Sequence, residues 1–198
     1  MECHTLEAMK NRFACKNYLN KEIEDEKLGL ILEAGRLSPA SFGLEHWHFH
    51  VCRSQDILWT CPAQESMKTA PVTVVITCNN HTFFDPEGSF FKERMSRFPL
   101  SFEESKQDYM HHYNHLDSKE LDQWSRAQSY IAVTNMTTVA SELGIQSCII
   151  EGYNSKKLLE ALDLNPNENI IGIVCAFGYQ NENNSKKIRL PFDEVVTF

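Results

Sequence analysis

The sequence lacks the glycine-rich loops that most often hold a phosphate group. No G-x-G-x-x-G follows an expected strand, no G-x-x-x-x-G-K-[ST] occurs, and the 198 residues include only eight glycines. These absences exclude the Rossmann dinucleotide cradle and the P-loop. A phosphate-bearing ligand would therefore have to be held by cationic side chains.

Positive charge and long apolar runs are also scarce. The net charge is -8, which argues against nucleic acid or an anionic membrane as a partner, because both require a basic surface. No stretch approaches the ~20 apolar residues that span a bilayer. The N-terminus has no basic segment followed by an apolar run, as a signal peptide would. We therefore expect a protein that binds neither nucleic acid nor membranes.

The seven cysteines are scattered and never form a C-x-x-C pair. Neither a disulfide framework nor a zinc ribbon is indicated, and a reducing, cytoplasmic setting fits best. Because free cysteine is usually buried, we expect Cys148 and Cys175 to lie inside strands.

The composition that remains is typical of one globular domain spanning residues 1–198, with 42% hydrophobic and 23% charged residues. Apolar periodicity predicts a helix over 28–35 and a helix over 124–143 that carries few charges and is therefore buried nearly all round. Alternating or β-branched runs predict strands at 47–52, 71–78, 145–150 and 169–179, with a short helix beginning near Asn154 and Ser155.

Residues 79–123 show little steady periodicity and predict irregular short helices or a lid. The segment is rich in aromatic residues that either line a substrate pocket or pack within the lid: Phe83, Phe84, Phe90, Phe91, Phe98, Phe102, Tyr109 and Tyr113.

Two compact basic groups stand near opposite ends of the chain. Arg12 and Lys16 form the first, and Lys186, Lys187 and Arg189 form the second. By themselves such groups are more often solvated surface charge than a ligand site. Composition does not decide between the two interpretations.

Five separated segments resemble, in order, the motifs of the FMN-dependent nitroreductase family. Arg12-Phe13-Ala14-Cys15-Lys16 resembles an opening R-x-S-x-[RK], and residues 37–41 with 47–49 resemble S-P-S-S…P-W-x-F. Residues 124–130 are similar to the start of the central helix, 143–145 with 150–153 to L-G-[IL]…I-E-G-[FY], and 187–191 to K-x-R-L-P. One motif alone is weak, but five in register are specific.

The resemblance implies an α+β nitroreductase-like fold, with a mixed, mainly antiparallel central sheet flanked by helices in an intertwined homodimer. The 124–143 helix would lie near the twofold axis, and the C-terminal tail would extend onto the partner.

The implied activity is that of an FMN-dependent NAD(P)H oxidoreductase. Hydride would pass by a ping-pong sequence from NADH or NADPH to a small acceptor such as a nitroaromatic or quinone. The flavin would carry the chemistry, so no catalytic side chain is expected.

The resemblance also assigns roles to individual residues. Arg12, Lys187 and Arg189 would grip the FMN phosphate, where an arginine fork suits phosphate oxygens. Lys16 would lie at the pyrimidine edge of the ring and favour the reduced, anionic flavin. The backbone of Glu151 and Gly152 would face flavin N5 and O4. The full set of expected cofactor-binding residues is Arg12, Phe13, Ala14, Lys16, Pro39, Ala40, Ser41, Gly43, Gln64, Ile150, Glu151, Gly152, Lys187 and Arg189.

Within that set, Pro39, Ala40 and Ser41 would come from the partner subunit, and Gly43 would let their loop bend beside the ring.

The sequence departs from the family pattern at several places. Ala14 and Ala40 replace hydroxyl residues, and each lost hydrogen bond is worth about 1 kcal/mol. Ala63 stands where an Asn is usual, with Gln64 as a substitute, and Glu45-His46 replaces a frequent Gln-Pro. Weaker flavin binding than usual is expected.

Other functions remain as alternatives. His46, His48 and His50 alternate along a strand, and His111 and His115 have the i, i+4 spacing of helical metal ligands. No carboxylate or cysteine accompanies them in pattern, so we expect surface or half-buried histidines and no metal site. A flavin-binding or flavin-sensing protein without turnover is a second alternative. The same fold can also serve dehydrogenation, dehalogenation or flavin breakdown, and residues 79–123 would then decide the reaction.

Overall fold

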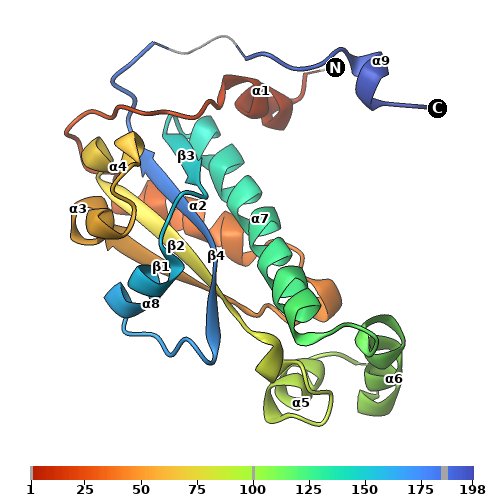
Figure 1. Ribbon diagram of the computed structural model, residues 1–198. Helices are drawn as coiled ribbons and strands as arrows, with labels where there is room; N and C mark the ends of the chain where they lie inside the picture. Colours follow the sequence, from red (N-terminus) through yellow and green to blue (C-terminus); the bar gives the residue numbers. More distant parts are fainter. Residues whose placement is uncertain (1, 100, 184–186) are drawn as a thin grey trace.

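The computed structural model describes residues 2–99, 101–183 and 187–198, and its centre is a four-stranded sheet with helices on both faces (Figure 1). The strands are β1 (Trp47–Arg53), β2 (Val72–Asn79), β3 (Gln146–Ile150) and β4 (Asn169–Gly178), in the order β1-β2-β4-β3. Every pair of neighbouring strands is antiparallel, and the one parallel feature among the described residues is the isolated bridge between Ala14 and Ser147. The expected α+β architecture is confirmed.

The helices connect and cover these strands. Their bounds are α1 (His4–Asn11), α2 (Asp25–Arg36), η1 (Ser41–Gly43), α3 (Ser54–Ile57), η2 (Leu58–Thr60), α4 (Glu65–Thr69), η3 (His81–Phe83), α5 (Ser89–Met95), α6 (Phe102–Tyr113), α7 (Ser118–Glu142), α8 (Ser155–Ala161) and α9 (Phe192–Val195). Within the described part of the chain, no helix combines the length and the apolar character needed to cross a bilayer.

The β-branched run of β2 is buried on both faces because each face has its own helical layer. Val74 and Ile76 pack with Ile173 of β4 against α2 and α7. Val75 points to the opposite layer, where α4 and α8 contribute Met67 and other apolar residues. Two cores therefore hold the sheet, as the continuous apolar pattern of this strand predicts.

The long helix α7 differs from its sequence prediction in two ways. It begins at Ser118 rather than near Trp124, because Asp117 and Glu120 form a reciprocal capping box that supports a polar first turn. It is also not buried all round, since Ala127, Ile131 and Thr134 are exposed. The sheet, α1 and α2 leave one side of the helix uncovered within a single chain.

The lid predicted over 79–123 is folded around its own aromatic cluster. Phe84, Phe91 and Tyr109 are buried in it, so the packing interpretation is the one that holds for these rings. Tyr109 lies 4.7 Å from Phe91 and 5.2 Å from Tyr113, measured between ring centroids. In Figure 1 the lid helices α5 and α6 sit beyond the N-terminal end of α7, away from the sheet.

Truncating Ile173 to alanine should lower the free energy of unfolding by about 2–5 kcal/mol, because its fully buried side chain would leave a cavity between β4 and α7. Urea unfolding at one fixed protein concentration measures the change. The matched control is Val51→Ala on β1, whose side chain is 45% exposed. Equal effects of the two substitutions would contradict this description of the core.

Candidate functional site

Four cations from two distant parts of the chain line one pocket: Lys10, Arg12, Lys187 and Arg189. Lys10 is already paired with Glu7 at 2.7 Å, so the other three are the candidate anion-binding group. Arg12 is the residue that ends α1, and Lys187 and Arg189 belong to the segment before α9. They enclose a space of about 340 Å³ together with the α7 residues Thr134, Thr137 and Thr138. None of the described residues that line this pocket is acidic, so the arrangement suits an anion.

Burial and neighbouring positive charge both lower the pKa of Lys187. Partial burial lowers the pKa of its ammonium group below the ordinary value, and the guanidinium groups of Arg12 and Arg189 lower it further. The ammonium donates a hydrogen bond to the carbonyl of Met9. A bound dianion would relieve the repulsion among the three charges. The neighbouring Lys186 lies outside the described residues.

The segment after Arg12 runs along β3 and orients the next candidate residues. The Cys15 N–H donates to the Ser147 carbonyl at 3.2 Å, and the Phe13 N–H donates to Gln146 Oε1 at 3.3 Å. The Phe13 ring is buried in the core, so only its backbone can face a ligand. Ala14, by contrast, is exposed.

Lys16 adopts a position that sequence reasoning did not anticipate. Its Nζ lies 3.1 Å from the Sγ of Cys148 on β3, and its backbone N–H donates to the carboxylate of Glu182. The ammonium group is thus directed over the middle of β3. Cys148 was predicted to be a buried strand residue, which is confirmed, but its contact with the lysine carries no sequence signal.

The turn that follows β3 brings together three further candidates. Ile150 is buried at the end of the strand, whereas Glu151 and Gly152 are exposed. Gln64 Nε2 donates to the Gly152 carbonyl at 3.2 Å, so the residue expected to substitute for the missing Asn does reach this turn. A Cβ on residue 152 would lie 2.4 Å from that same nitrogen. The absence of a side chain here permits the close approach.

In the described part of the chain, the loop from Pro39 to Gly43 is hydrogen-bonded to α7 and to Arg97 and not to the residues of the pocket. The Ser41 N–H donates to Gln128 Oε1 at 3.0 Å, and Arg97 donates to the Gly43 carbonyl at 2.6 Å. The backbone has positive φ at Phe42 (54°), Gly43 (59°) and Glu45 (45°), so the expected bend is present and extends past the glycine. Among the described residues of one chain, no hydrogen bond joins this loop, which includes Pro39 and Ala40, to the three cations.

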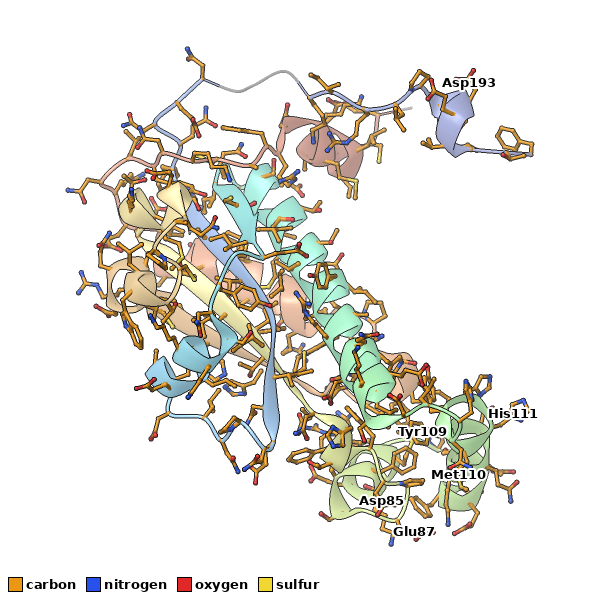
Figure 2. All side chains as sticks on the ribbon, in the orientation of Figure 1. Asp85, Glu87, Tyr109, Met110, His111 and Asp193 are labelled. Atoms are coloured by element: carbon orange, nitrogen blue, oxygen red, sulfur yellow. The ribbon has the colours of Figure 1, made fainter. Side chains whose placement is uncertain are left out.

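The histidines do not assemble as the metal-site alternative requires. His46 is fully buried, not at the surface or half-buried as expected, and stacks on Trp124 with ring centroids 5.1 Å apart. Burial lowers its pKa to about 4. α6 ends at Tyr113, so His111 and His115 do not share a helical face; Figure 2 shows His111 pointing outward from the lid. In the described ranges, no group of three His, Cys, Asp or Glu is placed to hold a metal.

Several residues of the site were missed by the motif comparison. Thr134, Thr137 and Thr138 have the i, i+3, i+4 spacing of one helix face, so the sequence could have indicated that they lie together. Arg126 hydrogen-bonds to Tyr153, the residue after Gly152. No local pattern could have indicated that contact, because 27 positions separate the pair.

Known proteins match this chain over nearly its whole length. The family model described as the nitroreductase family matches residues 9–179. The chain belongs to the nitroreductase family. A Staphylococcus haemolyticus protein that is named as an NAD(P)H nitroreductase is 32% identical, and the match covers 96% of this chain and 95% of that protein. A Haemophilus influenzae protein of the same designation is also 32% identical, covering 96% and 94%.

Solved structures agree on the nitroreductase fold. The nitroreductase family protein of Streptococcus pneumoniae TIGR4 superimposes with a TM-score of 0.77 at 21% identity, covering 98% of both chains. A nitroreductase-type protein of Exiguobacterium sibiricum, solved in complex with FMN, gives a TM-score of 0.80 at 16% identity, covering 100% of this chain and 98% of that one. The nitroreductase family consists of oxidoreductases, so this chain is classed as an enzyme of that type.

Inorganic phosphate should stabilise this nitroreductase through the three-cation pocket, because an anion that binds only the folded state raises its stability. We expect phosphate to raise the thermal midpoint of the wild type clearly and that of Arg12→Met or Lys187→Met much less. In phosphate-free buffer, Lys187→Met should be no less stable than the wild type, because it removes like-charge repulsion. Arg53→Met, which removes an exposed cation at the end of β1, is the control. An undiminished phosphate response in both pocket variants would place anion binding elsewhere.

Proposed function

We propose that this protein is an FMN-dependent NAD(P)H oxidoreductase that reduces nitroaromatic or quinone-type acceptors by a ping-pong sequence. The observation that carries the proposal is the convergence of Arg12, Lys187 and Arg189 on one pocket without acidic residues in its lining. The names of the related proteins specify NAD(P)H, and the solved relative from E. sibiricum holds FMN. NADH and NADPH both remain candidate electron donors.

The charges of the pocket fit the phosphate of FMN, which carries close to two negative charges near neutral pH. Arg12 and Arg189 would each offer a planar fork to two phosphate oxygens, and Lys187 would add a point charge. Thr134, Thr137 and Thr138 form the α7 side of the pocket, and each hydroxyl donates to a backbone carbonyl of the same helix. The flavin ring would then extend along β3 toward the turn at Glu151 and Gly152.

Side chains around the ring would position and tune it rather than react. Lys16, held 3.1 Å from Cys148 Sγ, places a positive charge beside β3, where it would favour added negative charge on the ring. Gln64 and the backbone of Gly152 would border the ring edge. When bound, FMN supplies the hydride chemistry between nicotinamide and acceptor. Protein groups would exclude water and fix the stacking geometry.

The replacements at Ala14 and Ala40 remove two hydroxyl groups that the family pattern offers to the flavin. In their place, backbone groups of the exposed segment at residue 14 can face the ligand. Gln64 supplies the amide expected in place of Ala63. We propose that these departures leave FMN bound but less tightly than usual, with the phosphate grip providing a larger share of the affinity.

A homodimer would complete the site. Residues 187–198 run away from the body past α1 in Figure 1 and carry Asp193 at the end opposite to the lid in Figure 2. Their apolar side chains are unusually exposed in one chain, with Ile188 at 83%, Phe192 at 67% and Leu190 at 66%. A second copy could cover this tail and bring its own Pro39–Gly43 loop to the flavin.

A reducing, cytoplasmic location fits the seven cysteines, all of which are free thiols in the structure.

The proposal is tested by titrating FMN into the purified protein and then adding NADH or NADPH under nitrogen. We expect saturable FMN binding by calorimetry, loss of the oxidised flavin absorbance on adding a nicotinamide, and its return when a nitroaromatic or quinone is added. Absence of FMN binding would reject the proposal. Binding without bleaching by either nicotinamide would instead identify a flavin-holding protein without turnover.

The shared site predicts that mass and cofactor retention change together. Phe192→Asp should shift the protein from dimer toward monomer in size-exclusion chromatography with light scattering, because a charge would replace an apolar contact with the partner. FMN retention after dialysis should fall in parallel. Phe192→Leu, which keeps the apolar character, is the matched control. A wild-type monomer with full FMN affinity would be incompatible with a dimeric site.

A further inference from the structure

One guanidinium group ties three parts of the chain together below the turn at Glu151 and Gly152. Arg126 lies on α7 and is half-buried. Its Nε donates to the Gly172 carbonyl on β4 at 3.0 Å. Its Nη2 donates to the Tyr130 hydroxyl at 3.1 Å and to the Tyr153 hydroxyl at 3.2 Å. Helix, strand and turn therefore meet at a single side chain.

The carbonyl that Arg126 reaches is available because β4 contains a bulge. Ile173 pairs with Ile76 and Ile171 pairs with Thr77, so Gly172 between them has no partner residue on β2. A Cβ at position 172 would meet Ser129 at 2.7 Å, which explains the glycine. The Tyr153 hydroxyl also donates to the same carbonyl at 3.3 Å. The bulge thus anchors both the guanidinium and the turn.

Tyr130 extends the network to the carboxylate of the turn. Its hydroxyl oxygen accepts from Arg126, which leaves its own proton to donate to Glu151. Burial raises the pKa of Tyr130 to about 12, and the hydrogen bond to Glu151 adds to that effect. The phenol therefore keeps its proton at neutral pH. It holds an otherwise exposed carboxylate on the α7 side of the turn.

We propose that Arg126 is a positioning residue for the flavin: through Tyr130 and Tyr153 it fixes the Glu151–Gly152 turn and keeps the Glu151 charge in one place beside the ring. The opposite side of the turn is held by Gln64, so the backbone is clamped from α7 and from the start of α4. This inference rests on the proposed function, because it concerns the surface on which the flavin ring would lie.

Loss of the network should have two measurable consequences. A less ordered turn must pay an ordering cost when FMN binds, so the affinity falls. Without the hydrogen bond from Tyr130, the negative charge of Glu151 near the ring is no longer partly offset, which disfavours the reduced anion and makes the flavin midpoint potential more negative. A residue that served only to hold α7 against β4 would change stability without shifting the potential.

The experiment compares Arg126→Met, Tyr130→Phe and the double variant with Lys119→Met, which removes a positive charge two turns away on α7. FMN affinity is measured by calorimetry and the midpoint potential by spectroscopic redox titration. For the loss of charge-assisted hydrogen bonds we expect roughly tenfold weaker FMN binding in Arg126→Met. Both single variants should show a more negative potential. The double variant should match Arg126→Met, because the two residues act along one path.

Full additivity of the two single substitutions would overturn the inference, as would an unchanged potential in both or an equal effect of Lys119→Met. Tyr130→Phe keeps Arg126 on its β4 and Tyr153 contacts, so it remains informative if Arg126→Met folds poorly. Hydrogen exchange at residues 151–153 in the FMN-free proteins separates this inference from the proposed function. Faster exchange in the variants supports the clamp even if no FMN binds, and unchanged exchange rejects it.

Discussion

Like charges held close together on a folded chain repel one another, and a ligand of opposite charge relieves that repulsion. Arg12, Lys187 and Arg189 are such a group: partial burial lowers the pKa of the lysine, and the two guanidinium groups lower it further. The two apolar cores on either side of the sheet stabilise the fold that keeps these cations together. In the proposed function, a bound dianion would offset this repulsion.

The sheet order explains why the turn and the cations can serve one ligand. β3 is an edge strand, and its free side receives the segment after Arg12, while its end leads into the Glu151–Gly152 turn. An extended ligand lying along this edge would meet cations at one end and exposed backbone at the other. Edge strands usually expose unpaired backbone groups to other chains. Here part of that edge is occupied by the protein's own N-terminal segment.

The sequence predicted those features that depend on neighbours along the chain. The β-branched run of β2, the helix expected over 28–35, which lies within α2, and the start of α8 after Asn154 each appear in the structure. It failed where distant packing decides. The burial of His46 depends on Trp124 and Phe84, and the exposed stripe of α7 depends on what α2 leaves uncovered. The candidate site likewise combines features that local sequence predicts with contacts that depend on distant residues.

Motif resemblance found the candidate cations and the turn, because each belongs to a short recognisable segment. The contact between Lys16 and Cys148 and the bond from Gln64 to Gly152 join residues more than 80 positions apart, so local spacing cannot reveal the contacts. The same distance along the chain has a temporal meaning. Arg12 is synthesised well before Lys187 and Arg189, so the pocket that all three line cannot form until the later segment has been made and has folded against α1 and α7. Capture of an anion by this pocket would therefore follow the folding of α1 and α7 and would not guide it.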